Sequence, residues 1–403
     1  LYTCVVPLTT MATNRRGNKK TGRGGGGNDP AKKRRCTNNA DDDEDDSNNT
    51  SSNNNNNNPL AQVVVPDPAV SAAIDESDNA AAAAAAVAAT TNNDDELPTT
   101  NQLSRELCKI VDVVHYSRDE SLRALDNLTK WACTEDADFL KSFHTYGGIV
   151  KVLDFLKATM NDVNCKGSIR MECIEKAADV ISTVTFEGED AMNKDIAAKI
   201  ATTLLDCDGI DTLITANEEY TGGDDIVRLK AMWSVWNAFG ILTHTLTTSD
   251  LVMNQKTAST IFDAGIDAMS QLKSVGGPIA SEILEAIFCT FYNIVFYNYV
   301  TRKYFQDKNI LSKCLEVLKR NGLWTFEGGE GLIELAIEFF DCCCDANLLD
   351  DSSDYEIILP LLVVALKKFP SNDEIRAGAM NMMDRSCSTI NDKKIIERSG
   401  ALE

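Results

Sequence analysis

The feature that most constrains the fold is a short phrase that recurs from about residue 101 to the end of the chain. In each copy, bulky apolar residues are followed four or five positions later by a Gly-Ile step and then by an amphipathic run. The clearest copy begins at Phe143, and one helical face then carries Ile149, Val152, Leu153 and Leu156. Such a unit cannot bury its apolar face alone, so its recurrence predicts stacked helical repeats.

The Gly-Ile step predicts where each unit turns. It recurs at Gly209 and Gly265, with Asn replacing Gly at Asn309, and a last partial copy reaches Gly400. Glycine and asparagine tolerate a left-handed backbone better than other residues do. We therefore expect Gly148, Gly209, Gly265 and Asn309 to form sharp corners between a short helix and a longer one.

A second, longer apolar helix is predicted between successive corners. The six predicted helices are Ser121 to Ala132, Ile169 to Val184, Ile226 to Leu242, Glu282 to Val295, Gly331 to Cys344, and Glu374 to Cys387. Two units are longer than the others, which predicts surface loops near residues 161–167, 188–190 and 220–225. Pro360 lies where one corner is missing, and we expect it in the first turn of the helix that follows.

Each unit consists of a short helix, a corner, a long helix and a third helix, and the units repeat over about residues 101–403. This pattern resembles the armadillo repeat family. The step from Gly265 to Asn309 falls within the roughly 40 to 47 residues of armadillo or HEAT units. HEAT repeats are the close alternative, with two helices and no corner of this kind. The resemblance implies an all-α, right-handed solenoid of about six repeats, the last incomplete. Because the chain begins at Leu1 and its last unit stops at Leu402, we expect a fragment edge or a capping partner.

The resemblance also implies a binding surface. Armadillo domains bind extended peptides along a concave groove, through an Asn near the end of each third helix and a Trp one turn earlier. Trp233 and Asn237 match that pair, and Asn127 and Asn293 occupy the Asn position without the Trp. We expect these residues to line one surface and bind a partner. The alternatives are core packing for Trp233 and an interior hydrogen bond or plain solvent exposure for Asn237.

Residues 1–100 differ in kind from the rest of the chain. They contain a Gly cluster, an acidic block, a poly-Asn run and an Ala run, with almost no aromatic residues. Such a segment buries too little apolar surface to offset its conformational entropy, so it is predicted to be disordered. Its basic tract resembles a short nuclear-import signal, formed by Lys32, Lys33, Arg34 and Arg35. This predicts an intracellular protein of the cytoplasm, the nucleus or both.

Charge and hydropathy limit the partners. The formal net charge is -22 and belongs mostly to the helical part. An acidic body argues against nucleic-acid binding by that part, and it favours basic or extended segments of other proteins. No apolar run reaches the ~18 residues of a membrane span, which predicts no membrane contact. The odd total of 13 Cys predicts reduced core thiols rather than a secreted disulfide framework.

The sequence contains no recognisable catalytic, cofactor or metal site. The three histidines are far apart, and Cys342, Cys343 and Cys344 are adjacent. Neighbouring helical side chains point in different directions, so these thiols cannot surround one tetrahedral metal. We therefore predict a non-enzymatic scaffold or adaptor that binds another protein along its concave helical surface. The alternative is an import-receptor-like adaptor for basic extended peptides.

Overall fold

The computed structural model describes residues 97–112, 115–188, 191–219, 225–249, 253–272, 275, 277–297, 299–321, 329–349 and 353–389. Within these ranges it contains fifteen helices, α3 to α17, and no strand, so the predicted all-α class is confirmed. The first of them, α3 (Thr100–Val111), begins where the boundary near residue 100 was predicted. The predicted disordered region up to residue 96, its basic tract Lys32 to Arg35, and Gly400 lie outside the described residues.

Local sequence sets where the first helices begin. The Thr99 hydroxyl accepts from the Gln102 backbone N–H, and the Gln102 side chain accepts from Thr99 in return. Ser117 and Glu120 repeat this reciprocal arrangement before α4 (Arg118–Ala132). These capping boxes satisfy backbone N–H groups that have no partner inside the helix.

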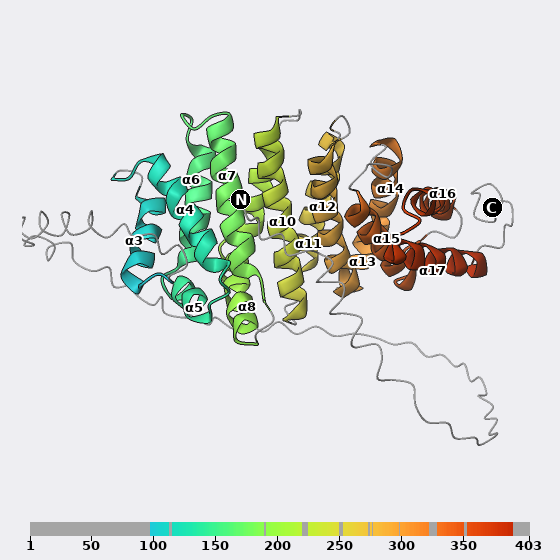
Figure 1. Cartoon of the computed structure of the whole chain (residues 1–403), viewed down its shortest axis with the longest axis horizontal. Coiled ribbons are helices and arrows are strands. Elements are labelled where there is room, and N and C mark those ends of the chain that lie inside the picture. Colours follow the sequence, from blue (N-terminus) through green and yellow to red (C-terminus); the bar gives the residue numbers. More distant parts are fainter. Residues whose placement is uncertain are drawn as a thin grey trace, which may run out of the picture. The chain divides into compact units, whose positions relative to one another are not determined.

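Six long helices pack against one another in chain order and form a first row (Figure 1). In this row α4 contacts α7, and each later member contacts the next. These are the six long helices predicted from sequence, and their existence is confirmed. The row comprises α4 (Arg118–Ala132), α7 (Ser168–Thr185), α10 (Ile226–Thr248), α12 (Pro278–Tyr297), α15 (Glu330–Asp345) and α17 (Asp373–Thr389).

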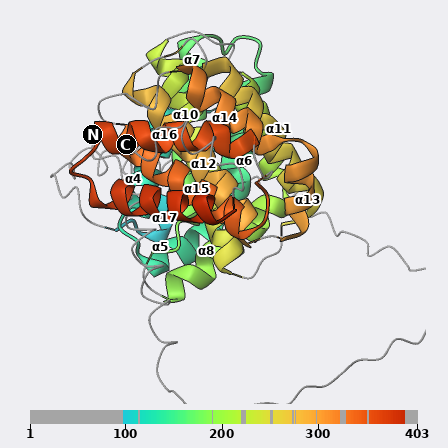
Figure 2. The ribbon, with the colours of Figure 1, turned by 90° about the vertical axis from the view of Figure 1, so that its right-hand side faces the viewer.

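A second row of helices packs beside the first in the same order. Its members are α3, α6 (Gly148–Asn161), α9 (Gly209–Glu218), α11 (Gln255–Gln271), α14 (Ile310–Asn321) and α16 (Ser353–Lys368). Figure 2 views the helices from the side on which α16 and α17 end both rows. Three shorter helices complete the set: α5 (Ala137–Thr145), α8 (Ala191–Asp206) and α13 (Tyr299–Asp307). The arrangement is therefore repeat-like, because each unit adds one helix to each row.

Two of the four predicted corners lie one residue before the predicted glycine. The left-handed residues are Gly147, at φ 66°, and Asp208, at φ 57°, while Gly148 and Gly209 begin α6 and α9. A Cβ on Gly148 would lie 2.5 Å from the Phe143 ring, so close packing rather than backbone conformation requires this glycine. Asn309 is left-handed as predicted, with φ 51°.

Gly265 and Pro360 do not mark helix ends, contrary to prediction. Gly265 lies inside α11, and a Cβ there would lie 2.5 Å from the Phe291 ring and 3.1 Å from Trp236. It lets α11 approach its neighbours and continue as one helix. Pro360 lies inside α16 rather than in a first turn, because α16 already begins at Ser353.

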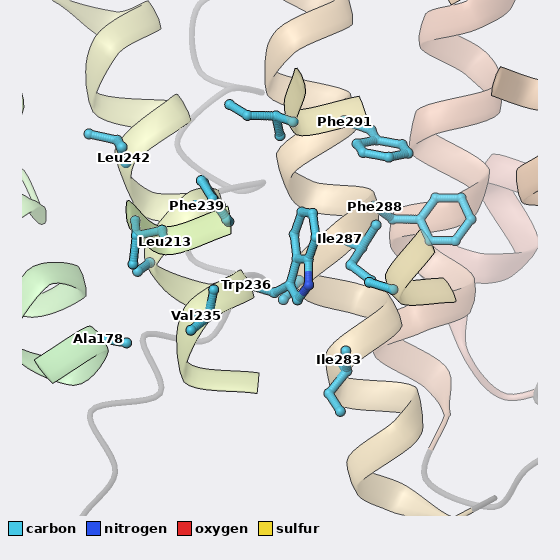
Figure 3. Close-up of a cluster of buried hydrophobic side chains, with 14 of the residues drawn as sticks. Ala178, Leu213, Val235, Trp236, Phe239, Leu242, Ile283, Ile287, Phe288 and Phe291 are labelled. Atoms are coloured by element: carbon cyan, nitrogen blue, oxygen red, sulfur yellow. The ribbon is translucent and has the colours of Figure 1, made fainter. Parts of the chain in front are cut away.

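The core runs between the two rows. Trp236 of α10 is fully buried beside Phe239, with Ile287 and Phe288 of α12 nearby (Figure 3), and its indole N–H donates to Asn217 of α9 at 2.9 Å. The window Pro278–Phe296 of α12 has the length and mean hydropathy of a membrane span, a match that the sequence interpretation did not anticipate. Neighbouring helices bury 72% of that window, which is typical of a core helix.

Candidate functional site

The first-row helices share an outer face, which is the side that no second-row helix covers. On α10 it consists of residues that recur with helical spacing and are half-buried or exposed: Ile226, Lys230, Trp233 and Asn237. Trp236, one position from Asn237, points the other way into the core. The structure therefore places Trp233 and Asn237 on the same face, as their i, i+4 spacing predicted.

Polar contacts connect this face from α4 to α10. Asp126 of α4 forms an ion pair with Lys176 of α7 at 2.8 Å. One turn later on α7, the Asp179 carboxylate is hydrogen-bonded by Ser234 of α10. These two contacts join α4 to α7 and α7 to α10, next to Asn127 on α4 and Trp233 on α10.

Asn293 does not belong to the outer face, which corrects the prediction that three asparagines share it. Its side chain is 1% exposed. The amide donates to the Gly240 carbonyl at 3.1 Å and to the Thr243 hydroxyl at 3.3 Å, both on α10. A buried amide requires such partners, and the seam between α10 and α12 supplies them. The predicted surface therefore loses Asn293.

Asn127 is also engaged within the protein. It is half-buried, and its amide lies 3.5 Å from the Glu106 carboxylate of α3, a distance at the long limit of a hydrogen bond. Trp233 packs partly against the core while one side stays accessible. Of the predicted residues, Trp233 and Asn237 are therefore the pair best placed to meet a partner.

Carboxylates lie on the helices beside this pair, and the sequence interpretation did not single them out. They belong to α7 and α12, which pack against α10, and to α15 one helix further on, where Arg385 of α17 pairs with Asp341 and Asp345. Lys176 and Lys230 are the nearby bases of α7 and α10. The acidic residues are Glu172, Glu175, Asp179, Glu282, Glu285, Glu334, Asp341 and Asp345. Their helical spacing was visible in the sequence, but which helices stand side by side was not.

Burial perturbs several of these acids. It raises the pKa of Asp179 above its ordinary range, although Ser234 donates to it and Lys176 lies nearby. Burial also raises the pKa of Glu175, with the Asp179 charge adding to the effect. Burial, then the neighbouring Glu282 and Glu334 charges, raises the pKa of Glu285 to about 7. Crowded, partly buried carboxylates make this face attractive to cationic groups.

Two hollows lie near helix ends among the described residues, and neither is lined by Trp233 or Asn237. One, of about 630 Å³, is lined in part by Glu187, Lys194 and Thr248. The other, of about 350 Å³, lies beside Arg118 and Asp162, which form an ion pair at 2.7 Å.

Among the described side chains, no three His, Cys, Asp or Glu residues converge as metal ligands. Cys342 and Cys343 are buried, and burial raises the pKa of the Cys343 thiol well above its ordinary value. These thiols pack in the core, as predicted for them.

Comparison with known proteins adds little. No protein-family model and no curated protein matches the chain. Among solved structures, the chain is similar to a crystal structure of an engineered protein, a structural-genomics target. The two are 13% identical, with 72% of this chain and 97% of that chain covered and a TM-score of 0.46. This likeness is too weak to establish a shared fold or function.

Proposed function

We propose that this protein is a non-enzymatic scaffold or adaptor that binds another protein along the outer face of its first-row helices. In this proposal the two rows form an armadillo-like solenoid, and the first row lines its concave side. The single observation that carries the proposal is that Trp233 and Asn237 lie together on the outer face of α10, where Asp179 of α7 contacts Ser234. An accessible aromatic side chain among polar groups is typical of an interface anchor.

The import-receptor-like alternative has support of its own. Carboxylates of α7 and α12 lie on the helices on either side of Trp233, and burial leaves several of them with raised pKa values. A Lys or Arg side chain of a partner would offset that unfavourable charge. This alternative therefore commits to basic extended segments, whereas a general scaffold does not.

The decisive experiment measures binding of the full chain to an array of extended peptides that differ in charge. We expect Trp233→Ala with Asn237→Ala to weaken binding at least tenfold, because truncating a central anchor typically costs more than ~1.4 kcal/mol. A matched control is Asp211→Ala with Thr215→Ala, which changes two exposed residues of α9 in the second row. Circular dichroism and the unfolding midpoint verify that each variant is folded.

The outcome separates the two candidate functions. Preference for Lys/Arg-rich peptides that fades with added salt favours the import-receptor-like function. Binding without a charge preference favours the scaffold. If the α9 control weakens binding as much as the α10 variant does, the outer face of the first row is not the binding surface.

A further inference from the structure

The seam between α12 and α15 contains a carboxylate that has no cation facing it. Glu285 of α12 is half-buried, and its Oε2 atom lies 2.8 Å from where a Cβ on Gly331 of α15 would stand. The carboxylate therefore lies against the backbone of α15, in space that a side chain at position 331 would fill. Ionised there, it would lose most of its hydration.

The groups that act on Glu285 have the same sign of charge. Glu282 lies one turn earlier on α12, and Glu334 faces it from α15. Glu334 is held in place by Asn372, which donates to it at 2.6 Å. Other helices also pack against α12, and their charged groups, such as Lys230 of α10 and Arg302 of α13, do not shift the pKa of Glu285.

Asp263 and Asp267 of α11 likewise leave the pKa of Glu285 unchanged. Arg302 instead donates to backbone carbonyls at the end of α12, Val295 among them at 3.1 Å. Glu285 thus meets two like charges, and no base among the described residues acts on it.

We propose that this seam is a pH-sensitive junction, closed while Glu285 is protonated and loosened when Glu285 ionises. The helices beyond the seam, α15 to α17, are then held less firmly against α12 as the pH rises. Loosening follows because an ionised Glu285 gains hydration and separation from Glu334 when the seam opens. The raised pKa of about 7 places this change near neutral pH.

Hydrogen exchange of the full chain, corrected for the intrinsic pH dependence of exchange, tests the junction. Between about pH 6 and about pH 8 we expect amides of α15 and α17 to lose about tenfold more protection than those of α4 and α7. Glu285→Gln removes the charge at nearly constant volume and abolishes that difference. Equal changes in all helices, or a difference that persists in Glu285→Gln, overturn the proposal.

A control and a second variant keep the test decisive. Glu187→Gln removes a different buried acid, whose pKa is also raised to about 7, and leaves the α15 to α17 response intact. Glu334→Gln removes the facing charge, lowers the pKa of Glu285 and moves the midpoint of the response to lower pH. An unchanged midpoint in Glu334→Gln contradicts the junction even if Glu285→Gln fails to fold.

Discussion

At the scale of single residues, buried polar groups hold neighbouring first-row helices together. Asn293 joins α12 to α10 through the Gly240 carbonyl and the Thr243 hydroxyl. Thr245 of α10 donates to the Thr185 carbonyl of α7 at 2.7 Å in the same manner. Because these groups have no access to water, each bond specifies which helix faces which.

Asn293→Ala is expected to lower the free energy of unfolding by about 1 to 3 kcal/mol, because it removes buried hydrogen bonds and leaves a small cavity. Asn237→Ala, on the outer face of α10, is the matched control and should cost less than about 0.5 kcal/mol. Urea denaturation measures both. Equal costs would mean that the amide of Asn293 contributes no more than a surface side chain.

At the scale of whole helices, α16 contains a local conflict. Pro360 lies inside the helix, where it has no backbone N–H to donate and its ring crowds the preceding turn. Neighbouring units pack this segment as a helix all the same, with Tyr355, Ile358 and Leu359 buried around the proline. Tertiary burial thus overrides a residue that ordinarily interrupts helices.

Pro360→Ala is expected to raise the free energy of unfolding by about 1 to 3 kcal/mol, since Pro costs ~3 kcal/mol relative to Ala inside a helix and some ring packing is lost. Pro278, the first residue of α12, offers a control, because a first-turn proline needs no N–H partner. Pro278→Ala should therefore have little effect. Thermal melts compare the stability of the two variants. A neutral or destabilising effect of Pro360→Ala would show that α16 is adapted to the proline.

At the scale of the whole molecule, the buried acids determine how stability changes with pH. Burial is the largest cause of the raised pKa of each of five carboxylates: Glu175, Asp179, Glu187, Glu282 and Glu285. An acid with a raised folded-state pKa contributes stability that is fully present below its ordinary pKa. That contribution is lost as the pH rises through the folded value.

The helical part should therefore be more stable near pH 5.5 than near pH 8. For Glu187, which is 5% exposed, the shift from 4.5 to about 7 corresponds to at most about 3 kcal/mol. Unfolding midpoints across this range measure the effect, and Glu187→Gln should flatten part of it. Asp162 and Glu120 oppose the trend only at lower pH, because hydrogen bonds lower their pKa values. A midpoint that rises toward pH 8 would contradict the assignment.

The sequence by itself determined the existence of the six long helices. Apolar spacing identified all six long helices, because a helix presents every third or fourth residue to its core. The match of Trp233 with Asn237 was also readable, since their shared face depends only on helical geometry. Both are local properties.

Only the tertiary structure decided what each residue faces. Gly265 was predicted to be a corner, yet the Phe291 ring of α12 is what requires a glycine at this position. Asn293 and Asn237 occupy the same position in the sequence pattern, yet the neighbouring helix buries Asn293 while Asn237 stays accessible. The carboxylates with raised pKa values come from α7 and α12, on either side of α10, so their arrangement appears only when those helices pack. Contacts between distant segments depend on how the rows assemble, and no local pattern encodes that.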